Sequence, residues 1–72
     1  MNKVDIGYYA GKVWTILNAN NGRCSYEELK DLSALPEREL NAAIGWLARE
    51  DKVEFEETYK GLFIFLPVNF YF

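Results

Sequence analysis

Apolar residues recur every three or four positions through the first quarter of the chain, which is the spacing of one side of an α-helix. The Asn- and Gly-rich run 18–22 follows, and such residues favour helix ends and turns. The pattern therefore predicts a first helix over about residues 4–19. Its buried side is expected to carry Ile6, Tyr9, Ala10, Val13, Trp14 and Leu17.

A second helical pattern begins at Ser25, a residue type that is favoured at helix N-caps. Glu28, three residues later, completes a capping box, in which two side chains satisfy free N–H groups at the start of a helix. We expect this helix over about residues 26–32, and the pair Arg23-Cys24 before it is long enough only for a minor strand. The inward side chains of the second helix are predicted to be Tyr26, Leu29 and Leu32.

A third helical pattern follows a turn at residues 32–35. Pro36 suits the first position of a helix because its missing N–H would have had no partner there. Glu37 and Glu39 favour the positive end of the helix dipole. A third helix is therefore expected over about residues 36–50, with a buried stripe of Leu40, Ala43, Ile44 and Leu47.

The pattern then changes to alternation with a period of two, which is the period of a β-strand. Val53 and Phe55 fall on one face, and glutamates occupy the other. A strand with one buried face is therefore expected over about residues 52–57.

A second strand pattern follows the turn Tyr59-Lys60-Gly61. Residues 62–66 are apolar on both faces, so this strand must be covered on both sides or paired with something. We expect it to form a hairpin with the first strand and to end at Pro67. An aromatic tail follows over residues 67–72.

The order of these elements is that of a winged helix-turn-helix domain, in which a three-helix bundle carries a C-terminal β-hairpin wing. The sequence thus predicts the α+β class and a single domain over residues 1–72. A chain of this length buries only about 60% of its unfolded surface, so its core must be dense. A content of 50% hydrophobic and 17% aromatic residues supplies that core.

Two segments carry a resemblance to a known family. The run from Asn41 to Val53, together with Ala10 to Trp14 in the first helix, resembles very small bacterial winged helix-turn-helix domain proteins of unknown function. The resemblance covers nearly the whole chain. It implies the winged-helix fold, with DNA binding inferred from that fold alone. It implies no functional residue, because function depends on a site and not on a fold.

The charge of the chain weighs against a general affinity for DNA, which depends largely on neutralising phosphates with Lys and Arg. The chain has 8 basic and 11 acidic residues, a net charge of −3 and a pI near 4.8. Residues 26–57 alone hold four basic residues against ten acidic ones, a balance of −6. Unless those carboxylates point away from the DNA, strong nonspecific binding is not expected.

One face of the third helix nevertheless has a composition suited to DNA. Opposite the buried stripe, at about 100° per residue, it carries Arg38, Asn41, Ala42, Gly45 and Arg49. Arg and Asn read guanine and adenine edges, and small residues let a helix sit deep in a major groove. With Lys60 of the hairpin turn near a phosphate, these are the candidate DNA-binding residues. The alternative is that the two arginines are solvated or paired with glutamates, and that Gly45 permits close helix packing.

The end of the chain is rich in aromatic residues, and two interpretations remain open. Large aromatics at a terminus serve as core filler, or they form an exposed apolar surface of the kind that marks interfaces. In the second case a partner protein or a second copy of the chain would cover them. The candidate protein-interface residues are Phe63, Phe65, Phe70, Tyr71 and Phe72.

Residue types that support catalysis are scarce in this sequence. There is no histidine, and the single cysteine, Cys24, allows neither an internal disulfide nor a thiolate zinc cluster. We expect Cys24 to act as a small buried hydrophobe. The run Gly7 to Lys12 has only three residues between its glycines and lies inside the first helix, so it is not a phosphate loop. Neither an enzyme, nor a cofactor, nor a metal site is expected.

No run approaches the roughly 18 apolar residues of a membrane span, and the N-terminus lacks the apolar core of a signal peptide. A soluble, cytoplasmic protein is therefore expected. Two functions are carried forward. The first is a DNA-binding transcription regulator that acts as a dimer on double-stranded DNA. The second is an acidic winged helix that serves as a protein–protein interaction or homodimerisation module without binding DNA.

Overall fold

The computed structural model describes residues 1–67, so most of the predicted aromatic tail lies outside the described residues. Each of the three helices lies within one residue of its expected bounds. Within residues 1–67, no helix is long and apolar enough to cross a bilayer. The elements in chain order are α1 (Lys3–Ala19), β1 (Arg23–Ser25), α2 (Tyr26–Ser33), α3 (Glu37–Arg49), β2 (Glu54–Thr58) and β3 (Gly61–Phe65).

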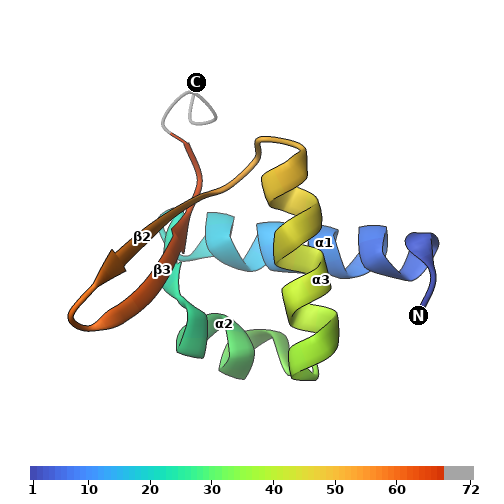
Figure 1. The fold of residues 1–72 in the computed structure, drawn as a ribbon, viewed down its shortest axis with the longest axis horizontal. Coiled ribbons are helices and arrows are strands. Elements are labelled where there is room, and N and C mark those ends of the chain that lie inside the picture. Colours follow the sequence, from blue (N-terminus) through green and yellow to red (C-terminus); the bar gives the residue numbers. More distant parts are fainter. Residues whose placement is uncertain (68–72) are drawn as a thin grey trace.

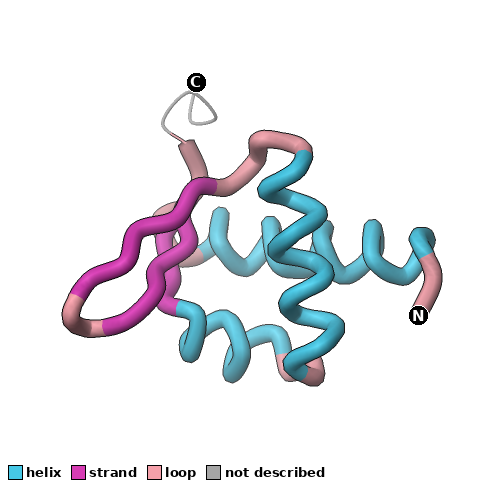
Figure 2. Tube along the Cα trace, in the orientation of Figure 1, coloured by secondary structure: helices cyan, strands magenta, loops and turns pink. Residues whose placement is uncertain are grey.

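The helices and strands are arranged as a winged helix. Figure 1 shows α3 crossing α1, α2 running from the sheet to the start of α3, and the β2–β3 hairpin projecting on the side away from the N-terminus. The helical part and the strand part are distinct in Figure 2. The three strands form an antiparallel sheet in the order β1-β3-β2. This arrangement confirms the predicted fold class.

The core lies where the helices meet the inner side of the sheet. Burying a Leu, Ile or Val side chain stabilises a fold by about 1.5–3 kcal/mol, so these residues provide much of the stability. All four members of the predicted third-helix stripe are buried. The full buried set is Ala10, Val13, Leu17, Cys24, Leu29, Leu40, Ala43, Ile44, Leu47, Val53, Ile64 and Leu66.

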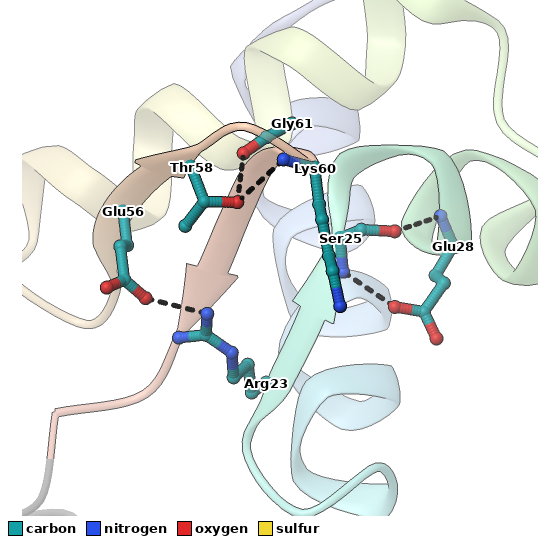
Figure 3. Close-up of polar contacts among 7 residues, drawn as sticks. All are labelled: Arg23, Ser25, Glu28, Glu56, Thr58, Lys60 and Gly61. Atoms are coloured by element: carbon teal, nitrogen blue, oxygen red, sulfur yellow. Dashed lines mark hydrogen bonds and ion pairs between the residues drawn. The ribbon is translucent and has the colours of Figure 1, made fainter.

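The predicted capping box at the start of α2 is confirmed. The backbone N–H of Glu28 donates to Ser25 Oγ at 3.1 Å, and the backbone N–H of Ser25 donates to Glu28 Oε1 at 2.8 Å (Figure 3). Two amide groups at this helix end therefore have partners. A second capping box, between Asn2 and Asp5, begins α1.

The turn between α2 and α3 differs from the sequence-based expectation at two residues. Leu32 was expected to face inward, but its exposed fraction is 53% and Ser33 is fully buried instead. Ser33 is four residues after the buried Leu29, and its hydroxyl accepts a hydrogen bond from the Leu35 N–H at 3.2 Å. The inward position of the turn is thus held by a polar acceptor and not by the apolar Leu32.

Pro36 precedes α3 and is not its first residue as expected. Its ψ of 153° is extended, so it is the N-cap, and its carbonyl accepts the first helical hydrogen bond from Leu40 N–H at 2.9 Å. A proline at either position leaves no amide without a partner, which is why sequence alone does not distinguish them.

The hairpin also departs from expectation. The first strand begins at Glu54 and not at residue 52, and Phe55, expected to be buried, has an exposed fraction of 45%. Phe55 lies opposite the buried Ile64 and therefore shares its face, but β2 is an edge strand that the helices do not cover. The second strand occupies the centre of the sheet, so its predicted need for pairing is met by β1 and β2. The expected minor strand is present as β1.

Ala34, the C-cap that follows α2, has a left-handed backbone with φ of 56°. This conformation costs a non-glycine residue roughly 1–2 kcal/mol, and glycine adopts it freely at the expense of a more flexible unfolded chain. We predict that Ala34→Gly raises the free energy of unfolding by about 0.5–1 kcal/mol, and that the β-branched Ala34→Val lowers it by about 1 kcal/mol or more. Urea unfolding measures the free energy of unfolding of both variants. A glycine variant less stable than the wild-type chain would contradict the left-handed backbone of Ala34.

Candidate nucleic-acid interface

The outward side of α3 carries the five residues that the sequence placed there. The buried stripe of α3 packs against α1 and forms part of the common core, and the opposite side of the helix is open to solvent. Four of the five are exposed, and Ala42 is half-buried. The helix therefore presents a surface of two arginines, one asparagine and two small residues: Arg38, Asn41, Ala42, Gly45 and Arg49.

The two arginines of this face are in different electrostatic situations. The Arg38 guanidinium donates to Glu39 Oε1 from Nη2 at 3.0 Å and from Nε at 3.3 Å. This hydrogen bond holds the pKa of the Glu39 carboxyl below its usual range, with a backbone hydrogen bond adding to the effect. Arg49 has no hydrogen bond or ion pair with any residue in the part of the chain that the structure describes. The pairing alternative thus applies to Arg38 and not to Arg49.

Asn41 is connected to the preceding helix by its side chain. The Tyr26 hydroxyl donates a hydrogen bond to Asn41 Oδ1 at 2.7 Å. Because Tyr26 is the first residue of α2, this bond joins the two helices of the helix-turn-helix at the exposed surface. The amide of Asn41 is therefore oriented before any ligand arrives.

Gly45 is not required by packing within the described residues. A Cβ atom built on Gly45 would meet no heavy atom within 4 Å. A glycine in a helix interior costs roughly 1 kcal/mol relative to alanine. The alternative that Gly45 permits close helix packing inside the domain is therefore not supported, and the open space lies on the solvent side.

A cleft of about 460 Å³ separates α3 from the turn of the hairpin. Asn41 and Lys60 both line it, whereas the two arginines do not. Figure 3 shows the Lys60 side chain extending from the turn towards the start of α2, which borders the same cleft. The Lys60 backbone N–H donates to Thr58 Oγ1 at 3.1 Å, which fixes the turn.

The carboxylates of residues 26–57 do not all face this surface. Glu28 caps α2, Glu56 accepts from Arg23 Nη2 at 2.6 Å on the other side of the sheet (Figure 3), and Glu50 lies 3.7 Å from Lys52 Nζ. Glu27 and Glu37, however, line the cleft beside Lys60. The local charge is thus less negative than the sequence balance implies, yet it is not strongly positive.

The aromatic residues of β3 are covered in part by a side chain that sequence reasoning did not consider. Phe63 and Phe65 are half-buried on the outer face of the sheet. The Arg23 guanidinium carbon lies 4.4 Å from the ring centroid of Phe63 and 5.9 Å from that of Phe65. The strand register places Arg23 directly opposite Phe65, but register is not visible in the sequence. The other candidate interface residues, Phe70, Tyr71 and Phe72, lie outside the described residues.

A second surface was missed altogether, on the outward side of α1. Val4 and Tyr8 have exposed fractions of 81% and 72%. A Cβ atom added to Gly7 or Gly11, beside them, would meet no heavy atom of the described residues within 4 Å. The signal was present in the sequence, since a helical wheel places these four residues together opposite the buried side of α1.

The chemistry of metals and nucleophiles has little support in the described residues. Within residues 1–67, no group of three or more His, Cys, Asp or Glu side chains is placed to hold a metal ion. Cys24 has an exposed fraction of 1%. Its burial raises the pKa of the thiol, and the nearby Glu28 carboxylate adds to the rise. Cys24 is therefore a small buried hydrophobe, as expected, and not a thiolate at neutral pH.

Three helices with a helix-turn-helix and a hairpin wing define the winged-helix class of proteins. Residues 1–66 match the model of the family described as "Winged helix-turn-helix domain (DUF2582)", and the chain belongs to this family. It is also similar to the solution NMR structure of protein BT2368 from Bacteroides thetaiotaomicron, at 38% identity over 100% of this chain and 87% of that chain, with a TM-score of 0.82. No curated protein matches the chain.

The open space around Gly45 gives a prediction about stability. Gly45→Ala adds a methyl group without a clash and removes the cost of glycine in a helix, so the free energy of unfolding should rise by up to about 1 kcal/mol. The matched reverse change, Ala42→Gly on the same face, should lower it by a similar amount. Thermal or urea unfolding provides the measurement. A lower stability for Gly45→Ala would show that the space beside Gly45 is not free to accept a methyl group.

Proposed function

We propose that the chain is a cytoplasmic transcription regulator that binds double-stranded DNA with α3 in the major groove. In this proposal Arg38, Asn41 and Arg49 contact base edges and phosphates, and Lys60 of the hairpin turn lies next to the DNA backbone. The observation that carries it is the outward face of α3, where polar hydrogen-bonding side chains surround the small residues Ala42 and Gly45.

The shape of this face supports a close approach to DNA. A recognition helix enters the major groove when short side chains at its centre let the backbone come near the base edges. The absence of a Cβ at Gly45, in open space, suits that approach and is not otherwise required by the fold. Arg and Asn are the donors best matched to guanine and adenine edges.

The hairpin supports the same orientation. Asn41 and Lys60 border one cleft, so a duplex lying against α3 also meets the turn of the wing. Lys60 is then the cation nearest the backbone on that side. Contacts from both α3 and the hairpin turn would fix the orientation of the duplex relative to the domain, which a single contact would not do.

The carboxylates determine what kind of binding is expected. Glu27 and Glu37 border the cleft and repel phosphate, so the nonspecific, charge-driven part of the affinity is small. Binding then depends on base contacts, and a sequence-specific protein with weak affinity for mixed DNA is the form of activity that this surface favours.

The DNA proposal predicts a modest salt dependence. Three cations facing phosphate give a slope of log affinity against log salt of about −3, from about −0.9 for each phosphate neutralised. Replacing two of them, in Arg38→Ala with Arg49→Ala, should weaken binding at least about tenfold at low salt and reduce the slope to about −1. Fluorescence anisotropy with duplexes selected from a random library measures both quantities.

The matched control removes the same charge from α1. Lys3→Ala with Lys12→Ala also lowers the net charge by two, but these lysines lie on a different helix from the candidate site. Their loss should leave the slope and the selected sequence unchanged. If no duplex is bound at low salt, or if both double variants weaken binding equally, binding through α3 is ruled out.

Self-association is a second candidate function, and the outward face of α1 favours it. The exposed side chains of Val4 and Tyr8 lie beside Gly7 and Gly11, whose open sides permit another helix to approach. Shallow grooves of about 430 and 630 Å³ flank this face, one towards α3 and one towards α2. This surface is better suited to a second copy than Phe63 and Phe65, because Arg23 covers those rings.

Self-association predicts a dimer that one substitution dissociates. Tyr8→Glu places a charge in the centre of the apolar face, so the dimer mass of the wild-type chain should fall to that of a monomer. Tyr59→Glu, at a side chain with an exposed fraction of 95% in the hairpin turn, adds the same charge elsewhere and should leave the dimer intact. Light scattering coupled to chromatography gives the masses. A wild-type chain that stays monomeric at its highest soluble concentration would eliminate this function.

A further inference from the structure

The hydrogen bond from Tyr26 to Asn41 has a consequence for base recognition. Among the described residues it is the one hydrogen bond between a side chain of α2 and a side chain of α3. It lies on the cleft that also contains Lys60, at the surface where the duplex is proposed to bind. This hydrogen bond can therefore influence how Asn41 contacts the duplex, in addition to joining the two helices.

An asparagine amide can present two kinds of group to a base. Its oxygen accepts hydrogen bonds and its nitrogen donates two. A free asparagine uses one of each on adenine, accepting from N6 and donating to N7. Guanine offers two acceptors, N7 and O6, so a group that only donates suits guanine better.

In the structure, the acceptor oxygen of the Asn41 amide is already engaged, whereas its donor nitrogen is not engaged by any described residue. Its oxygen, Oδ1, already accepts from the Tyr26 hydroxyl at 2.7 Å, which occupies one of the two lone pairs of that oxygen and orients the amide. The nitrogen keeps both of its donors. The group that Asn41 offers to an approaching base edge is therefore mainly a donor.

We infer that Tyr26 is a positioning residue that holds the donors of Asn41 towards the DNA and gives α3 a preference for guanine over adenine at the base pair that Asn41 meets. The inference rests on the proposed DNA binding and adds the base that is read and the residue that sets the reading. Tyr26 touches Asn41 and needs no contact with DNA itself.

The experiment compares base preference in variants that differ by one hydroxyl. The wild-type site is first defined by selection from a random duplex library, and guanine is then replaced by adenine at each position in turn. The wild-type chain should favour guanine at one position by about fivefold or more, the range of a good base contact. Tyr26→Phe removes only the donor to Asn41, so the preference at that position should fall at least threefold, while affinity for the adenine duplex is kept or rises.

Two further variants separate this role from a structural one. Asn41→Ala should abolish the preference at the same position, and adding Tyr26→Phe to it should change nothing more, because the hydroxyl acts through Asn41. Tyr9→Phe removes a phenol hydroxyl from α1 and should leave every preference unchanged. Thermal unfolding of each variant checks that the comparison is made between folded chains.

The outcomes that overturn the inference differ from those that overturn DNA binding. If the wild-type chain selects a sequence but Tyr26→Phe leaves the guanine preference unchanged, or weakens all duplexes by the same factor, the inference is wrong and DNA binding stands. If Tyr26→Phe acts equally with and without Asn41, the hydroxyl does not act through Asn41. If the wild-type chain selects no sequence, DNA binding and the inference fall together.

Discussion

The arrangement of the domain depends on the pairing of β3 with strands on both sides. β3 joins β2 through the hairpin, but its other neighbour, β1, comes about forty residues earlier in the chain. β1 ends at Ser25, which is also the N-cap of α2, so one ladder ties the wing to the helix-turn-helix. The Leu66 N–H extends the connection with a 2.8 Å bond to the Gly22 carbonyl. Strand pairing thus joins the hairpin to the start of α2, and both border the cleft that Asn41 also lines.

The acidic composition is compatible with the proposed DNA binding because several carboxylates already have partners within the domain. A carboxylate that caps a helix or pairs with an arginine contributes less to the potential around α3 than its count in the sequence suggests. Glu28 and Glu56 are occupied in this way, while Glu27 and Glu37 have no such partner among residues 1–67. In the proposed function, such a surface would discriminate against random DNA, because the general electrostatic attraction that holds any duplex would be weak. Selectivity would then come from few base contacts, which increases the importance of each.

Sequence predicted the fold well because its local signals are strong. The stripe of Leu40, Ala43, Ile44 and Leu47, and the capping box at Ser25, each require only neighbouring residues to be recognised. The errors fall where distant segments decide burial. Phe55 alternates correctly with Val53, but it lies on an edge strand that the helices do not cover.

The candidate site was predictable as a helix face and not as a set of contacts. A helical wheel groups Arg38, Asn41 and Gly45, since only the period of α3 is needed. The bond from Tyr26 to Asn41, and the cover of Arg23 over Phe63, join residues fifteen or more positions apart and appear only when the chain is folded. Glycines at positions 7, 11 and 45 sit inside helices with open space where a side chain would be, and each costs about 1 kcal/mol. A domain of this size has a total stability on the order of 5–10 kcal/mol, so three such costs are a large fraction of it. No packing among the described residues requires these glycines, and the proposed approach of DNA to α3 and of a second copy to α1 would account for them.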